Sequence, residues 1–181
     1  MAKLIYSAAM SLDGFIAGPG GSMDWLSPYA ETDGDADDLA QRTGSMLVGA
    51  RTFRGDDPHR GTDLEGTAFS GAWSGPQVIL THLVPPNPLH GLHFVDDVGR
   101  AISLARELAG DADYVNVLGA QTARQCLEAG ELDEVLTVIV PVLLGDGVRL
   151  FERVDGDPVR LERVSVETSR LNTTVWMRVL G

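Results

Sequence analysis

The sequence predicts an α/β fold in which a mostly parallel central sheet has helices on both faces and ends in an antiparallel hairpin. Two observations favour this fold. Short apolar runs with the length of buried strands alternate with segments whose apolar residues recur at helical spacing, which is typical of parallel strands joined by helices. The last part of the chain instead holds two strand-like segments joined by a short link, which predicts an antiparallel pair.

Length and composition indicate one globular domain over residues 1–181, with 44% hydrophobic and 22% charged residues. The net charge of −12, from 26 acidic and 14 basic residues, opposes binding to nucleic acids or anionic membranes. The single Cys126 excludes an internal disulfide and a cysteine-rich metal site, and we expect no metal. The sequence has no membrane-length apolar run and no signal-peptide layout, so we expect a soluble cytoplasmic protein.

The first part of the chain predicts a strand, a loop and a helix. Residues 3–9 form an apolar run that suits a strand buried on both faces. The glycine-rich residues 18–22 predict a loop, which is either a lid over a ligand or a plain surface loop. Residues 33–44 predict a short helix with acidic residues in its first turn, Leu39 facing inward and Gly44 at its end.

The middle of the chain predicts three strands. Residues 45–49 form one strand, which passes through a glycine directly into a helix start at residues 50–53. The glycine-containing residues 54–75 predict a loop. Residues 76–81 and 91–95 predict two further short strands.

A helix, a strand and a second helix are predicted next. Residues 98–110 carry one apolar stripe and predict a helix that is capped by Asp96 or Asp97. Residues 114–118 predict a buried strand that leads directly into another helix. This helix is expected to stop at Gly130, because glycine tolerates a positive φ.

The last part of the chain predicts one long strand and the hairpin. Residues 134–144 predict the strand, with Pro141 at an edge, a bulge or the strand end, because proline cannot donate to a sheet. Residues 159–168 and 171–180 predict the two antiparallel strands of the hairpin.

Candidate ligand-binding residues follow several of these strands. The backbone N–H groups of the helix that starts after Gly119 are unpaired and favour an anion, although a glycine there also fits a plain tight connection. A guanidinium and a hydroxyl follow the strand that ends at residue 49, and both suit a phosphate. The carboxyl ends of parallel strands meet at one edge of the sheet, where we expect Asp13, Arg51, Thr81 and Gly119 to converge.

A polar cluster lies inside the predicted loop. Asp56 and Asp57 stand next to Pro58, His59 and Arg60. Paired carboxylates beside an imidazole and an arginine can hold and protonate an anionic substrate. The same residues equally suit a turn before a proline.

Several of these segments resemble the dihydrofolate-reductase-like superfamily and, within it, the C-terminal reductase domain of the riboflavin-pathway deaminase/reductases. The resemblance depends on residues 11–17, 48–52 and 118–120, and on residues 132–134 followed by 141–147. The His-x-Glu and Cys-x-x-Cys zinc ligands of the deaminase half do not occur in the sequence.

The resemblance implies a dihydrofolate-reductase-like fold and an NADPH-dependent reductase with a small-molecule substrate. It places the cofactor phosphates at Gly49, Arg51 and Thr52. It places the adenosine end near Thr81 and His82 and the nicotinamide near Ile16 and Ala17. It places the pyrophosphate at Leu118, Gly119, Ala120, Gln121 and Thr122. The preference between NADPH and NADH stays open.

The resemblance also implies a substrate site, because the riboflavin-pathway reductases carry an Asp-Asp-Pro segment that residues 56–58 match. Asp57 would orient or protonate the substrate, and Arg60 would meet its ribose phosphate. Asp13 and Asp56 are further candidate substrate-binding residues. The implied activity is most like the 5-amino-6-(5-phosphoribosylamino)uracil reductase of riboflavin biosynthesis, with hydride transfer to a C=N or C=O carbon.

Two alternatives stay open. A dihydrofolate or pteridine reductase would place a carboxylate on the first helix, where Asp35, Asp37 and Asp38 are possible counterparts. A non-catalytic dinucleotide-binding domain could have the same fold without the chemistry. The resemblance also makes a homodimer an expectation, on which the sequence itself is silent.

Overall fold

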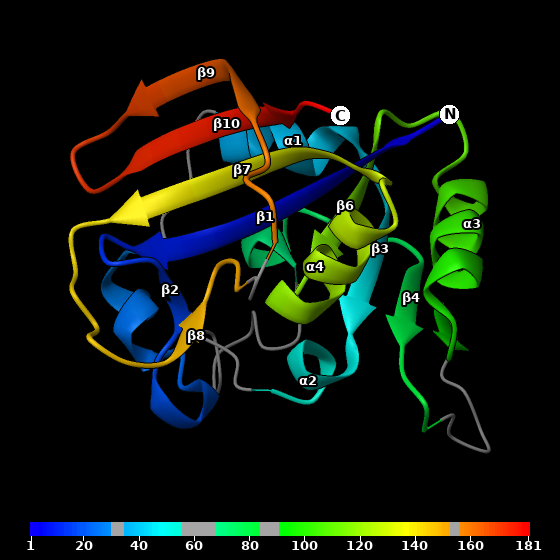
Figure 1. The fold of residues 1–181 in the computed structure, drawn as a ribbon, viewed down its shortest axis with the longest axis horizontal. Coiled ribbons are helices and arrows are strands. Elements are labelled where there is room, and N and C mark those ends of the chain that lie inside the picture. The colour runs from blue at the N-terminus through cyan, green and yellow to red at the C-terminus, as the bar shows by residue number, and fades with distance from the viewer. Residues whose placement is uncertain (30–34, 56–67, 84–90, 153–155) are drawn as a thin grey trace.

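The computed structural model describes residues 1–29, 35–55, 68–83, 91–152 and 156–181. Its main sheet has eight strands in the order β5-β4-β3-β6-β1-β7-β10-β9, and β2 and β8 form a separate pair (Figure 1). The strands are β1 (Lys3–Ser11), β2 (Phe15–Ala17), β3 (Thr43–Gly49), β4 (Gln77–Leu80), β5 (Leu92–Val95), β6 (Tyr114–Leu118), β7 (Leu132–Val140), β8 (Val148–Arg149), β9 (Leu161–Thr168) and β10 (Thr173–Val179). The helices are α1 (Asp35–Arg42), α2 (Ala50–Phe53), α3 (Val98–Ala109) and α4 (Ala120–Glu128), with short 3-10 helices η1 (Pro19–Gly21), η2 (Asp24–Tyr29) and η3 (Phe69–Gly71).

The strand directions confirm the predicted sheet. β1, β3, β4, β5, β6 and β7 pair in parallel, and β10 pairs antiparallel with both β7 and β9. The sequence did not predict the β2–β8 pair, because strands of three and two residues are too short to show a period.

Helices cover both faces of the sheet, as predicted. Leu4 and Tyr6 of β1 belong to the core cluster that contains the inward residues of α3 and α4. Ile5 points to the other face and packs in the cluster that contains Leu39 of α1. Figure 1 shows α4 in front of the sheet. Within the described residues, no helix is long and apolar enough to cross a membrane.

Two predicted boundaries were wrong. Gly44 does not end the first helix, because α1 ends at Arg42 and Gly44 already lies in β3. A Cβ at this position would collide with the backbone of Ala109, so the glycine allows α3 to pack closely on the sheet. The strand predicted over 134–144 is β7, which begins at Leu132 and ends before Pro141, whose ring nitrogen cannot donate to the ladder.

The predicted helix ends are explained by local hydrogen bonds. Asp97, rather than Asp96, caps α3, because its side chain accepts the backbone N–H of Arg100. Gly130 has a φ of 72° after α4 and donates its N–H to the carbonyl of Leu127. This geometry is a helix-terminating motif that favours glycine, and it confirms the predicted stop.

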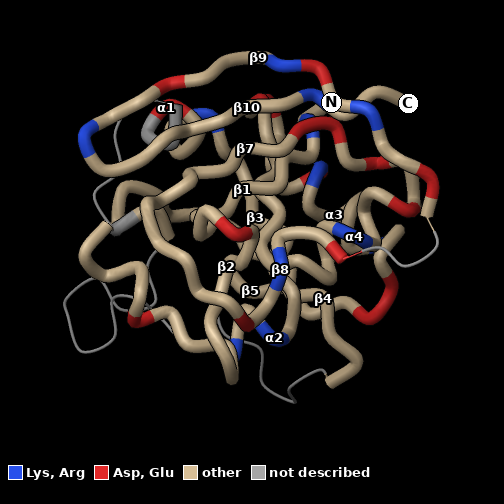
Figure 2. The backbone as a smooth tube through the Cα atoms, turned by 60° about the vertical axis from the view of Figure 1, so that its left-hand side comes forward, with Lys and Arg blue, Asp and Glu red and all other residues tan. Residues whose placement is uncertain are grey.

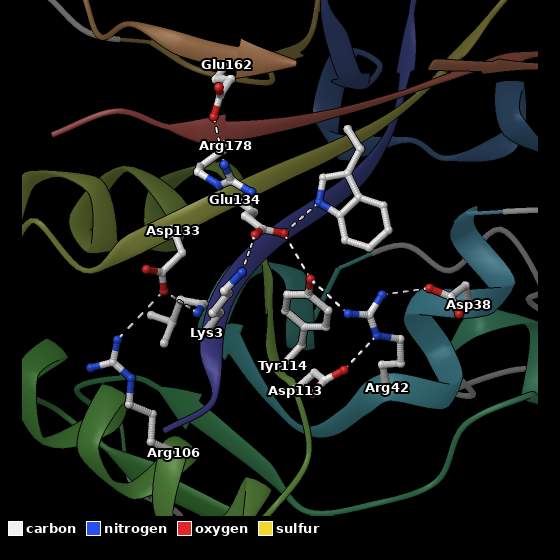
Figure 3. A network of polar contacts seen from close by, with 12 residues as sticks. Lys3, Asp38, Arg42, Arg106, Asp113, Tyr114, Asp133, Glu134, Glu162 and Arg178 are labelled. Atoms are coloured by element: carbon white, nitrogen blue, oxygen red, sulfur yellow. Dashed lines mark hydrogen bonds and ion pairs between the residues drawn. The ribbon is translucent and has the colours of Figure 1, made fainter. Parts of the chain in front are cut away.

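A buried carboxylate joins four strands near the amino ends of the parallel strands (Figure 3). Glu134 of β7 is 2% exposed and accepts three hydrogen bonds. The donors are Lys3 Nζ of β1 at 2.8 Å, Trp176 Nε1 of β10 at 2.7 Å and the Tyr114 hydroxyl of β6 at 3.0 Å. Arg42 then covers the rings of Tyr114 and Trp176, at 4.9 and 5.8 Å from their centres.

Burial alone would raise the pKa of the Glu134 carboxyl. The hydrogen bonds from Lys3, Trp176 and Tyr114 outweigh the burial, and they hold this pKa below its usual value. An acid whose pKa is lower in the folded than in the unfolded protein stabilises the fold when the pH is above the unfolded pKa. This stabilisation is lost as the pH falls through the folded pKa.

We therefore expect Glu134→Gln to lower the free energy of unfolding by about 3 kcal/mol at neutral pH, because an amide cannot match the charge that Lys3 and the other donors surround. At an acid pH below the lowered folded pKa of Glu134, the difference between the variant and the wild type should shrink, because the wild-type carboxyl is then protonated in the folded protein as well. Urea unfolding at both pH values measures this difference.

Glu162→Gln is the matched control. Its carboxylate also accepts an arginine, Arg178 Nη1 at 2.7 Å, but both side chains are about half exposed. The expected loss is below about 1 kcal/mol. Equal losses in the two variants would contradict the special role of Glu134.

Candidate functional site

A cleft of about 1730 Å³ opens at the carboxyl ends of the parallel strands, where ligands of such sheets bind. Every residue predicted to bind the cofactor lines this cleft: Ile16, Ala17, Gly49, Arg51, Thr52, Thr81, His82, Leu118, Gly119, Ala120, Gln121 and Thr122. The structure thus brings together residues from four separate segments, 16–17, 49–52, 81–82 and 118–122. Their contact with a cofactor stays a prediction.

Two glycine turns in the cleft interlock. β3 leads into α2 through Gly-Ala-Arg-Thr, and β6 leads into α4 through Gly-Ala-Gln-Thr. A Cβ at Gly49 would collide with the hydroxyl oxygen of Thr122, and a Cβ at Gly119 would collide with that of Thr52. Each turn therefore needs its glycine to admit the threonine of the other turn.

The anion arm of the cleft consists of residues 49–52 and 119–122. Here the Arg51 guanidinium donates a hydrogen bond to the side-chain oxygen of Gln121, which joins the two turns. Among the described residues, no side chain caps α4 and its first turn holds no acidic residue, so its first N–H groups are available to a ligand. Figure 2 shows basic positions at α2, on a chain with a net charge of −12. These donors fit the phosphates of a dinucleotide.

The apolar arm of the cleft lies on the α1 face of the sheet. Its lining residues are mostly apolar: Ala9, Leu39, Met46, Val48, Phe69, Leu118, Leu136 and Val138, with the polar residues Ser7 and Asn116. The charged side chains of the described lining all lie outside this arm, at the strand ends and next to β8: Arg51, Arg54, Asp96, Asp97 and Asp146. The apolar arm suits a flat, uncharged ring.

Asn116 has an unusual environment in the apolar arm. Its side chain is 1% exposed, and its Oδ1 accepts a hydrogen bond of 2.9 Å from the Ser7 hydroxyl. Its Nδ2 has no hydrogen-bond partner in the described part of the chain. This pair was not identified from the sequence. The signal that could have indicated it was an amide side chain in the centre of the otherwise apolar strand β6.

Asp13 does not line the cleft. Its carboxylate accepts hydrogen bonds from the Ser11 hydroxyl at 2.7 Å and from the backbone N–H groups of Leu144 and Gly145 at 3.0 and 2.7 Å. These bonds lower the pKa of Asp13 to about 2. The structure gives Asp13 an anchoring role between the β1–β2 turn and the segment after β7, and its predicted contact with a substrate stays untested.

The predicted catalytic Asp57 and the predicted substrate-binding Asp56 and Arg60 lie outside the described residues. The same holds for the side chains of Asp35 and Asp37. Asp38 is described, and its carboxylate forms an ion pair of 2.9 Å with Arg42 rather than lining the cleft.

Comparisons with known proteins identify the family of the chain. The family model described as RibD C-terminal domain matches residues 2–90 and 108–175. Among curated proteins, the uncharacterised protein YwjB of Bacillus subtilis is 24% identical over 164 residues, which cover 86% of each chain.

Solved structures share the fold. A candidate riboflavin biosynthesis protein from a Shewanella species has a TM-score of 0.73 and 22% identity, with 100% of both chains covered. The deaminase/5-amino-6-(5-phosphoribosylamino)uracil reductase of Thermotoga maritima has a TM-score of 0.68 and 20% identity over 99% of this chain, but only 57% of its own length is covered. A dihydrofolate reductase of Enterococcus faecalis, solved with NADP(H), has a TM-score of 0.63 and 15% identity, with 99% of this chain and 97% of the reductase covered.

We expect Gly49→Ala to cost about 1–3 kcal/mol of stability through the collision with Thr122 alone. The backbone itself tolerates alanine, because φ and ψ of Gly49 are −72° and 146°. Thr122→Ala removes the colliding hydroxyl and leaves the nearest remaining atoms at 3.6 Å or more.

The double variant Gly49→Ala/Thr122→Ala should therefore be no less stable than Thr122→Ala by itself. Chemical unfolding of the four proteins measures the coupling between the two sites. Simple addition of the two single losses would show that the turns do not interlock.

Proposed function

Because the chain belongs to the RibD C-terminal domain family, we propose that it is an NADPH-dependent reductase that transfers a hydride to a C=N or C=O carbon of a small substrate. One observation carries the proposal. The two interlocking turns place the free N–H groups of α4 and the Arg51 guanidinium around one position, next to an apolar arm that suits a ring.

In this proposal the anion arm binds the phosphates of NADPH. Thr81 and His82 follow β4 at the outer end of the cleft, where they would contact the adenosine. Ile16 and Ala17 of β2 would contact the nicotinamide, and the pairing of β2 with β8 holds them in place. When bound, NADPH would supply the hydride, and the protein would position the two rings and exclude water.

For the substrate, we propose a compound like that of the 5-amino-6-(5-phosphoribosylamino)uracil reductases, which the Thermotoga protein represents by name. Asp57 would deliver the proton, and Asp56 and Arg60 would bind the substrate. A folate-type substrate has less support, because Asp38, the described acid of α1, pairs with Arg42 outside the cleft. Turnover of dihydrofolate would reverse that preference.

The direct test is calorimetric titration of the purified protein with NADPH and, in parallel, with NADH, followed by NADPH oxidation in the presence of candidate pyrimidine substrates. Tight binding with oxidation supports a reductase. Binding without oxidation of any candidate supports a non-catalytic dinucleotide-binding domain, and the absence of binding to both nucleotides would overturn the proposal.

We expect Arg51→Ala to weaken NADPH binding by at least about tenfold, because a charged hydrogen bond to phosphate contributes about 1.5–3 kcal/mol. Arg51→Lys should recover part of the affinity, because lysine keeps the charge but loses the forked geometry. Calorimetry measures both constants.

Arg124→Ala is the matched control for charge. Arg124 lies on α4, is 40% exposed and faces Glu128 at 3.9 Å, and it does not line the cleft. Its removal should leave NADPH affinity within about twofold. An equal loss in Arg51→Ala and Arg124→Ala would mean that only net charge matters.

If Asp57 donates the proton, Asp57→Asn should lower kcat by about a hundredfold or more and leave the Kd of NADPH unchanged. Stopped-flow turnover and calorimetry separate the two quantities. Unchanged turnover would reduce Asp57 to a turn residue before Pro58.

A further inference from the structure

The floor of the apolar arm contains a polar pair, the buried Asn116 and the partly buried Ser7. In the sheet register, Asn116 of β6 lies between Ile5 of β1 and Met46 of β3, which are both buried and apolar. Ser7, two residues after Ile5 on the same face of β1, is the hydrogen-bond partner of its side chain. Both Ser7 and Asn116 line the cleft.

In the structure the Ser7 hydroxyl donates to Oδ1 of Asn116. Within the described residues, the NH2 group of Asn116 is left without an acceptor. A buried donor without an acceptor destabilises the folded protein by about 1–3 kcal/mol. Such a group persists where a ligand supplies the missing acceptor.

We propose that Asn116, held by Ser7, selects the substrate ring by donating a hydrogen bond from Nδ2 to a ring carbonyl oxygen. This inference rests on the proposed function and adds the recognition of the hydride acceptor. Phe69, Leu118 and Val138, which are only partly buried, supply apolar surface for the faces of the ring. A planar heterocycle with a carbonyl at its inner edge satisfies the amide, whereas an amino group at the same position meets a second donor and is rejected.

The test compares two small rings that differ at this position. 5,6-diaminouracil carries ring carbonyls, and 4,5,6-triaminopyrimidine carries amino groups or hydrogen instead. We expect the wild type to bind 5,6-diaminouracil at least about tenfold more tightly, by calorimetry at saturating NADPH. In Asn116→Leu, a change of similar size that removes the donor, the ratio of the two affinities should fall to near one.

Stability distinguishes recognition from a purely structural role. The double variant Ser7→Ala/Asn116→Leu removes both polar groups, so its Tm should equal or exceed that of the wild type while the ring preference is lost. A lower Tm together with an unchanged ring preference would overturn the proposal.

Ser45→Ala is the matched control for the serine. Ser45 is fully buried, whereas Ser7 is partly buried, and Ser45 lies on the opposite face of the sheet, where it donates to the carbonyl of Ala105 at 2.6 Å. This variant should lose stability and keep the wild-type affinities for both rings and for NADPH. Ser7→Ala should instead weaken 5,6-diaminouracil binding, because the amide is then free to turn.

The same titrations without NADPH keep the two proposals separate. A ring preference that depends on Asn116 in a protein that fails to bind NADPH would support the recognition role and overturn the reductase. If the protein binds and oxidises NADPH but Asn116→Leu changes the affinity for neither ring, the reductase proposal is supported and the recognition role of Asn116 is overturned. Failure of the wild type to bind 5,6-diaminouracil in either condition would overturn the role of Asn116.

Discussion

The cleft depends on the close approach of β3 and β6 at their carboxyl ends. These strands pair in parallel up to Val48 and Leu118, and each then turns into a helix through one glycine. A side chain at either glycine would collide with the threonine of the other turn. Because of this contact, α2 and α4 begin side by side and Arg51 reaches Gln121. Without the two glycines, the donors for an anion would lie on separate turns with no common centre.

At the amino ends of the parallel strands, a different interaction stabilises the sheet. The buried Glu134 of β7 holds four strands together there, because it accepts hydrogen bonds from side chains of β1, β6 and β10. The only lysine of the chain is one of the donors. A buried carboxylate is stable only when such partners surround it. The buried carboxylate thus stabilises the amino edge, whereas at the carboxyl edge the first N–H groups of α4 have no side-chain cap within the described residues.

The sequence was sufficient for features that depend on local chemistry. Apolar runs located the strands of the main sheet, and Gly130 and Pro141 marked an ending helix and an ending strand. Sequence-based prediction failed for features that are determined by contacts between distant segments. Gly44 is a glycine because α3 packs on it, and no local signal distinguishes that from a helix end. The interlocking of residues 49–52 with 119–122 also required the fold, although the repeated Gly-Ala-X-Thr was visible.

Under the proposed function, the two arms of the cleft would separate affinity for the cofactor from choice of the substrate. Along β6 and its turn, Asn116 lies on the floor of the apolar arm, and Gly119, three residues later, opens the anion arm. The anion arm uses backbone N–H groups and close glycine contacts, which few substitutions can preserve. The apolar arm uses side chains on one face of the strands, which can change without moving the backbone. A family on this fold can therefore keep one cofactor site and vary its substrates through the strand residues that form the floor.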